Sequence, residues 1–117
     1  MAFEHVGNAV YIIKFVVRDE GVELFNDWYN NNHLKWAADL FKCKSAIRLE
    51  ATHSPYCTHT YYAIYTFDSK EDMDIGLAMT PARDELIEDL KKIRPHVVEE
   101  EFMPTFEILT YYPEPNK

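Results

Sequence analysis

The stretch that decides the fold is VYIIKFVV, residues 10–17. Every member except Lys14 is apolar, and most are β-branched or aromatic, so the run predicts a strand. A strand with apolar side chains at consecutive positions is typical of one that is buried on both faces. The sequence therefore predicts a central strand whose sheet is covered on both sides.

A long helix is expected next, over residues 22–42. Its apolar side chains recur at steps of three and four, which places them on one helix face. The members of this stripe are Val22, Phe25, Tyr29, His33, Trp36 and Leu40. The spacing turns His33 inward, one helical turn from both Tyr29 and Trp36.

A hairpin and a second helical region follow. Residues 43–51 and 60–67 are β-prone and are joined by turn residues, which predicts two paired strands with an enlarged loop. Ser69 begins one helix and Thr80-Pro81 begins another. Pro95 ends the second helix.

The last strand is predicted at residues 105–112, and the acidic run 99–101 is assigned to a solvated loop. The resulting order is β-α-β-β-α-β, the split βαβ pattern. It predicts an α+β, ferredoxin-like fold, in which helices cover one face of an antiparallel sheet.

The uncovered face of this sheet predicts a homodimer. Large exposed apolar patches are rare in monomers, and two-fold pairing of two such faces would bury them. The aromatic and aliphatic residues assigned to the patch are Tyr61, Tyr62, Tyr65, Phe67, Phe106, Ile108, Tyr111 and Tyr112. Within the patch, Lys14 is predicted to pair with Glu107.

Length and composition narrow the class of protein. The chain has 117 residues, which fits one domain over residues 1–117 with a core at about 10–112. A net charge of −8 argues against nucleic-acid and anionic-membrane partners, and no apolar run is long enough to span a bilayer. Two cysteines do not make a disulfide scaffold, so we expect a cytoplasmic protein with reduced thiols.

The helix sequence Trp28-Tyr29-Asn30-Asn31-Asn32-His33-Leu34 adds a resemblance. With the element order and the length, it resembles the dimeric α+β barrel superfamily, especially EthD-like and related small members with a Trp/Phe-Tyr-x-x-x-His motif. The resemblance implies a pocket between sheet and helices, with His33 as the matching functional residue. The superfamily includes cyclases, isomerases, lyases and monooxygenases. The second strand histidine of some cyclases has no counterpart here.

His33 is the first candidate catalytic residue. Imidazole titrates near neutrality, and burial beside aromatic rings lowers its pKa, which suits a general acid–base group. Tyr11 and Tyr29 are the catalytic partners expected to hold a carbonyl or stabilise an oxyanion. The alternative is that His33 is a core histidine and that the tyrosines are ordinary packing residues.

Substrate-binding residues are expected along the same cavity. The predicted aromatic lining residues are Phe15, Phe25, Trp36, Tyr61 and Tyr65, and His59 and Arg83 add polar groups. Arg83 suits a substrate carboxylate, although a surface ion pair with Asp84 or Glu85 is the common alternative.

No metal or cofactor is predicted. The spacing of His53, Cys57 and His59 offers too few ligands for a structural zinc site, and the chain has no Gly-rich nucleotide loop. An axial role of His33 on a haem stays open.

The sequence therefore predicts a cofactor-independent isomerase, cyclase, dehydratase or lyase acting on a hydrophobic or aromatic carbonyl compound. Two alternatives remain: a binding protein for a hydrophobic metabolite, and a cofactor-free monooxygenase.

Overall fold

The computed structural model describes residues 8–52, 59–78 and 80–110, without the side chains of residues 80–82. The strands are β1 (Ala9–Val17), β2 (Ser45–Glu50), β3 (Thr60–Phe67), β4 (Val97–Phe102) and β5 (Phe106–Glu107). The helices are α1 (Val22–Trp28), α2 (Leu34–Phe41), α3 (Lys70–Leu77) and α4 (Thr80–Leu90). Shorter helical turns are η1 (Asp19–Gly21), η2 (Tyr29–His33) and η3 (Arg94–His96). Within these ranges, no helix has both the length and the apolar character that crossing a membrane requires.

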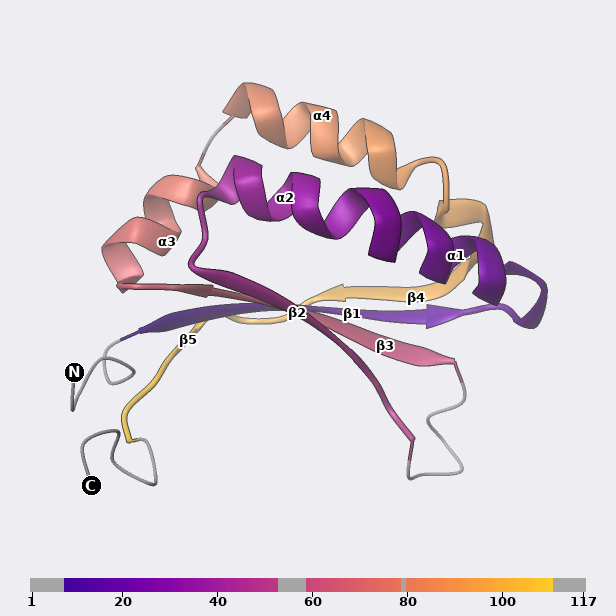
Figure 1. Cartoon of the computed structure of the whole chain (residues 1–117), viewed down its shortest axis with the longest axis horizontal. Coiled ribbons are helices and arrows are strands. Elements are labelled where there is room, and N and C mark those ends of the chain that lie inside the picture. Colours follow the sequence, from indigo (N-terminus) through magenta and orange to yellow (C-terminus); the bar gives the residue numbers. More distant parts are fainter. Residues whose placement is uncertain (1–7, 53–58, 79, 111–117) are drawn as a thin grey trace.

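The strands form one antiparallel sheet in the order β2-β3-β1-β4, and β5 pairs with one end of β1. The apolar strand β1 is central, as its sequence predicts. All helices lie on one face of the sheet, and the opposite face carries none of the described helices (Figure 1). The α+β, ferredoxin-like fold is therefore confirmed.

The register sorts the side chains of the sheet onto two faces. Tyr11 pairs with Tyr65 and Phe15 with Tyr61, and all four point toward the helices. The predicted membership of the open-face patch needs correction, because Tyr61, Tyr65 and Phe67 belong to the buried core on the helix side. The open face is mainly aliphatic instead, with Val10, Ile12, Ile47, Leu49, Tyr62, Ile64 and Phe106. Tyr111 and Tyr112 lie outside the described residues.

The last long strand is not where the sequence predicted it. The acidic segment Val97–Phe102 forms β4, whereas Phe106–Glu107 forms only the short β5. Because β4 is an edge strand, its carboxylates can point to solvent or pair with neighbouring cations. Glu99 pairs with Lys14 at 3.1 Å, so the predicted Lys14–Glu107 pair is wrong.

The first helical segment changes phase at its centre. Residues Tyr29–His33 form a π-helical turn between α1 and α2, and a wide turn of this kind shifts the faces of the helix that follows. Beyond it, Ala37 and Phe41 are buried, while Trp36 and Leu40 are only partly buried. Before it, Trp28 joins the buried set. The predicted stripe therefore holds as far as His33; beyond it, Ala37 and Phe41 take the buried positions, and Trp36 and Leu40 pack against the core only in part.

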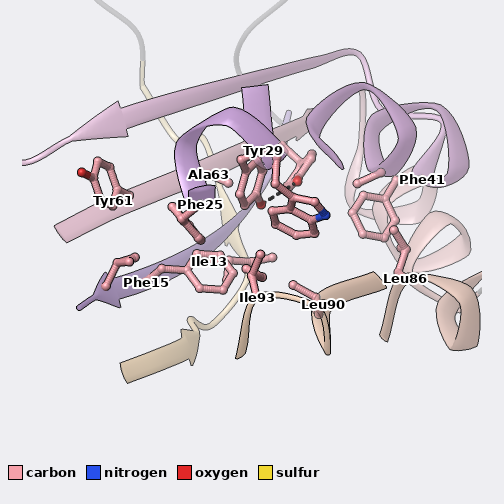
Figure 2. Close-up of a cluster of buried hydrophobic side chains, with 14 of the residues drawn as sticks. Ile13, Phe15, Phe25, Tyr29, Phe41, Tyr61, Ala63, Leu86, Leu90 and Ile93 are labelled. Carbon is pink, nitrogen blue, oxygen red and sulfur yellow. Dashed lines mark hydrogen bonds between the residues drawn. The ribbon is translucent and has the colours of Figure 1, made fainter. Parts of the chain in front are cut away.

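The core lies between β1, β3 and the helices. Phe25 of α1 packs on Phe15 and Tyr61, with ring centroids 5.3 Å and 5.5 Å apart (Figure 2). Leu90 of α4 and Ile93, which follows α4, belong to the same buried cluster (Figure 2). Helix α3 begins as predicted, because Ser69 accepts a hydrogen bond from the backbone N–H of Asp72 at 3.1 Å.

Candidate functional site

A cavity of about 480 Å³ lies between the sheet and helices α2, α3 and α4. Most of its wall is apolar and comes from the lining residues Ile13, Ala37, Phe41, Leu77, Leu86, Ile87, Leu90 and Phe102. Its polar groups come from Tyr11, His33, Tyr65, Arg83 and Arg94. An apolar chamber with a few convergent polar groups is the usual form of a small-molecule site.

His33 reaches this cavity from the π-helical turn. Only 3 % of the residue is exposed, and its ring stacks on Trp28 with centroids 4.2 Å apart. Its Nδ1 lies 2.8 Å from Oδ2 of Asp89 on α4. Burial lowers the pKa of His33, and the neighbouring Asp89 carboxylate partly opposes that effect. The imidazole is therefore neutral at pH 7.

Asp89 fixes the state of this imidazole. Its burial works against the carboxylate charge, but hydrogen bonds from His33 and from Lys92 hold the pKa of Asp89 below its usual value. An ionised carboxylate can only accept, so Nδ1 of the neutral ring carries the proton and donates it. The other ring nitrogen, Nε2, then has a free lone pair. Among the described residues, the hydrogen bond of the His33 ring is the one that Nδ1 makes with Asp89.

Two tyrosines face each other across β1 and β3 at the floor of the cavity. Tyr11 is opposite Tyr65, and their ring centroids are 6.2 Å apart. Burial raises the pKa of Tyr11 to about 12, although Arg83 acts in the opposite direction. Burial also raises the pKa of Tyr65. Both hydroxyls remain protonated at neutral pH and can donate hydrogen bonds to a ligand.

Tyr29 lies one layer behind the cavity wall. It is almost fully buried, and its hydroxyl lies 3.0 Å from the hydroxyl of Tyr65. Burial raises the pKa of Tyr29 well above its usual value. The side chain is not part of the cavity lining, so it reaches a ligand only through Tyr65.

The structure separates the other predicted substrate-binding residues from this cavity. Phe15, Phe25 and Tyr61 pack against one another in the core and do not line it. Trp36 lies on outer grooves between α2 and α4, because the π-helical turn rotates it away. His59 directly precedes β3, and its Nε2 is 2.8 Å from Oδ1 of Asp19. Of the residues predicted from sequence, the cavity brings together Tyr11, His33, Tyr65 and Arg83.

Sequence reasoning missed Asp89 and Arg94. Asp89 follows Leu86 by three residues and precedes Ile93 by four, so it belongs to the inward stripe of α4. An acidic residue on that stripe was the available signal for a buried polar partner. Arg94 lies beyond the helix in η3, where periodicity gives no signal.

Metal binding has no support within the residues that the structure describes, which contain no group of three or more potential His, Cys, Asp or Glu ligands. His53 and Cys57, considered above with His59, lie outside the described residues.

Solved structures with a similar backbone share this architecture. A NIPSNAP family protein of unknown function from Agrobacterium tumefaciens has a TM-score of 0.70 and 13 % sequence identity, over 97 % of this chain and 99 % of that one. SnoaB, a cofactor-independent oxygenase from Streptomyces nogalater (mutant N63A), has a TM-score of 0.68 and 14 % identity, over 93 % and 100 %. HapK from Hahella chejuensis has a TM-score of 0.59 and 16 % identity, over 89 % and 94 %.

Sequence comparisons add no family, because neither a protein-family model nor a curated protein sequence matches the chain. At these identities, likeness to solved structures shows the fold alone. None of the three is described as EthD-like. The neighbours thus place the chain among proteins with the ferredoxin-like α+β fold of NIPSNAP and cofactor-independent oxygenase structures.

Proposed function

We propose that this protein is a cofactor-independent enzyme that removes a proton from a hydrophobic, aromatic carbonyl compound. The observation that carries the proposal is the 2.8 Å contact between His33 Nδ1 and Asp89 at the wall of an apolar cavity. This contact leaves Nε2 as the base, and burial keeps the ring neutral and ready to accept a proton.

The reaction would begin with transfer of a C–H or O–H proton from the substrate to His33 Nε2. After loss of a C–H proton, the electron pair moves onto the substrate carbonyl oxygen and forms an enolate; after loss of an O–H proton, it stays on that oxygen as a phenolate. Tyr65 donates a hydrogen bond to that oxygen, and Tyr29 supports Tyr65 from behind. Asp89 stabilises the imidazolium that forms. Return of the proton to another atom completes an isomerisation or cyclisation; loss of a leaving group would give a dehydratase or lyase.

A cofactor-free monooxygenase is the second candidate, favoured by the fold shared with a cofactor-independent oxygenase. The same deprotonation produces an electron-rich carbanion that can react with molecular oxygen. One oxygen atom enters the substrate as a carbonyl, and the other leaves as water with the two hydrogens of the oxidised methylene group. Both candidates require His33 as the base.

Anthrone tests the proton abstraction, because it is an aromatic ketone with an acidic methylene group. Under nitrogen in D₂O, NMR should show wild-type protein accelerating deuterium incorporation at that carbon. His33→Ala and His33→Gln should lose about 10²–10⁴-fold of this rate. The matched control is His59→Ala, because His59 contacts Asp19 outside the cavity.

The outcome separates the hypotheses. Oxygen uptake with anthrone in air would identify the monooxygenase, and exchange without uptake would favour the isomerase class. Binding of anthrone with no exchange above background would support a binding protein and contradict the enzyme proposal. Full exchange activity in a folded His33→Gln variant would contradict the assigned base.

We also propose that the protein works as a cytoplasmic homodimer through the open face of its sheet. Ile47 and Leu49 on β2 and Phe106 on β5 are each more than two-fifths exposed there. A second copy of this chain would bury that patch by two-fold pairing. Sedimentation of wild type as a dimer and of Ile47→Glu as a monomer is expected; a monomeric wild type at micromolar concentration would contradict the proposal.

A further inference from the structure

The charge of the cavity is opposite to the charge of the chain. The protein carries a net charge of −8, yet its cavity wall includes Arg83 and Arg94. Among the described residues, no carboxylate lines the cavity. Because Glu100 pairs with Arg94, Arg83 supplies the unpaired positive charge, and a cation beside apolar walls attracts anions even when the molecule as a whole repels them.

The two arginines differ in what they bind. Arg94 contacts both carboxylate oxygens of Glu100, with Nε 3.2 Å from Oε1 and Nη2 3.0 Å from Oε2. Arg83 is exposed and belongs to none of the ion pairs among the described residues, so the pair with Asp84 or Glu85 that its sequence context favoured is not formed. The guanidinium of Arg83 is therefore available for a ligand.

Tyr11 gives this cation a hydrogen-bonding neighbour. The two side chains line the same cavity, and Arg83 acts electrostatically on the Tyr11 hydroxyl. A guanidinium binds a carboxylate through two parallel N–H donors, and a protonated phenol can donate a third hydrogen bond. The surrounding wall is apolar and suits the rest of an aromatic ligand.

We propose that the substrate is an aromatic compound bearing a carboxylate, which Arg83 binds together with Tyr11 while the reacting carbon faces His33. This inference rests on the proposed function, because it names the substrate class of the same cavity. Arg83 would fix the orientation of the substrate, and His33 would move the proton.

The probe is a matched pair of ligands, 2-naphthoate and the neutral 2-naphthamide, at pH 7.5. Isothermal titration should show wild type binding naphthoate about tenfold or more tightly than the amide. Arg83→Gln should lower the affinity for naphthoate by a similar factor and leave the affinity for the amide unchanged. Arg83→Lys should recover part of the naphthoate affinity. The matched control is Arg18→Gln, since Arg18 is exposed and does not line the cavity.

Equal binding of both ligands by wild type would overturn the inference, as would unchanged naphthoate affinity in folded Arg83→Gln or no binding of either ligand. Failure of the proposed function gives a different result. If His33→Gln retained exchange activity while Arg83→Gln lost the preference for naphthoate, the carboxylate-binding role of Arg83 would be supported. The assignment of His33 as the base would be contradicted.

Discussion

The pair Tyr11–Tyr65 and the pair Phe15–Tyr61 lie on the same face of the same two strands, yet only the first faces the cavity. Over the second pair, Phe25 of α1 fills the space. Over the first, α2 and α4 leave a chamber of about 480 Å³. The difference shows that the helix above, rather than the strand sequence, decides which aromatic residues pack and which line a site.

The largest expected effect is at the packed end. Phe25→Ala should lower the free energy of unfolding by about 3–5 kcal/mol, because it removes a ring that contacts others on several sides. The matched change at the cavity end is Phe41→Ala. It should cost less, since one side of that ring already faces the chamber. Urea denaturation measures the free energy of unfolding of both variants. An equal or larger loss for Phe41→Ala would show that the cavity end is packed as tightly as the end at Phe25.

The next effect concerns catalysis at the cavity end. Asp89→Asn should lower the rate of deuterium exchange about tenfold or more, which is less than the loss expected when His33 itself is replaced. The Asp89 carboxylate raises the pKa of His33 against the effect of burial, so its removal should move the acid limb of the pH–rate profile to lower pH. Asp84→Asn, an exposed change on the same helix, is the control. An unchanged plateau and limb would mean that Asp89 does not act through His33.

A smaller effect is expected in stability against pH. The pKa of His33 is lowered on folding from its usual value of 6.5, so below pH 6.5 the unfolded chain binds more protons than the folded one. Stability should therefore fall as the pH decreases from 6.5 toward the folded-state pKa. Urea titrations should show a weaker decrease for His33→Gln than for wild type. An identical decrease in both would show that other groups cause it.

The smallest effect separates the two aromatic pairs by single hydroxyl groups. Tyr11→Phe should change the free energy of unfolding by no more than about 1 kcal/mol. It should lower the affinity for naphthoate by less than Arg83→Gln does. Tyr61→Phe, which removes the hydroxyl that accepts a hydrogen bond from Asn26, should leave the affinity unchanged. Titration calorimetry compares the naphthoate affinities of the two variants. An equal loss of affinity in both would mean that naphthoate does not bind in the cavity beside Tyr11.

The fold followed from the sequence because its main signals are local. The apolar run in β1 and the helical periodicity before His33 both survive in the structure. The last strand did not follow, because the acidic residues of β4 look like a loop until one knows that they occupy a sheet edge. Trp36 was misplaced because a π-helical turn changes the helix phase without a clear composition signal.

The site was predictable only in part. His33 could be placed inward, but its partner Asp89 comes from a helix 56 residues away, and the pairing depends on how α4 packs. Tyr11 and Phe15 have the same alternation on β1, so periodicity could not separate a cavity residue from a packed one. That distinction arises from tertiary packing.

Each catalytic step proposed above depends on Asp89 holding His33 as a neutral base that faces the cavity. Long-range ¹H–¹⁵N spectra of histidine-labelled protein at pH 7.5 test it most directly, with His33→Gln used to assign the signals. We predict a proton on Nδ1, an unprotonated Nε2, and a change in the Nε2 shift when 2-naphthamide binds. A protonated Nε2 with an unprotonated Nδ1, or an Nε2 shift that does not respond to a bound ligand, would show that His33 is not the base.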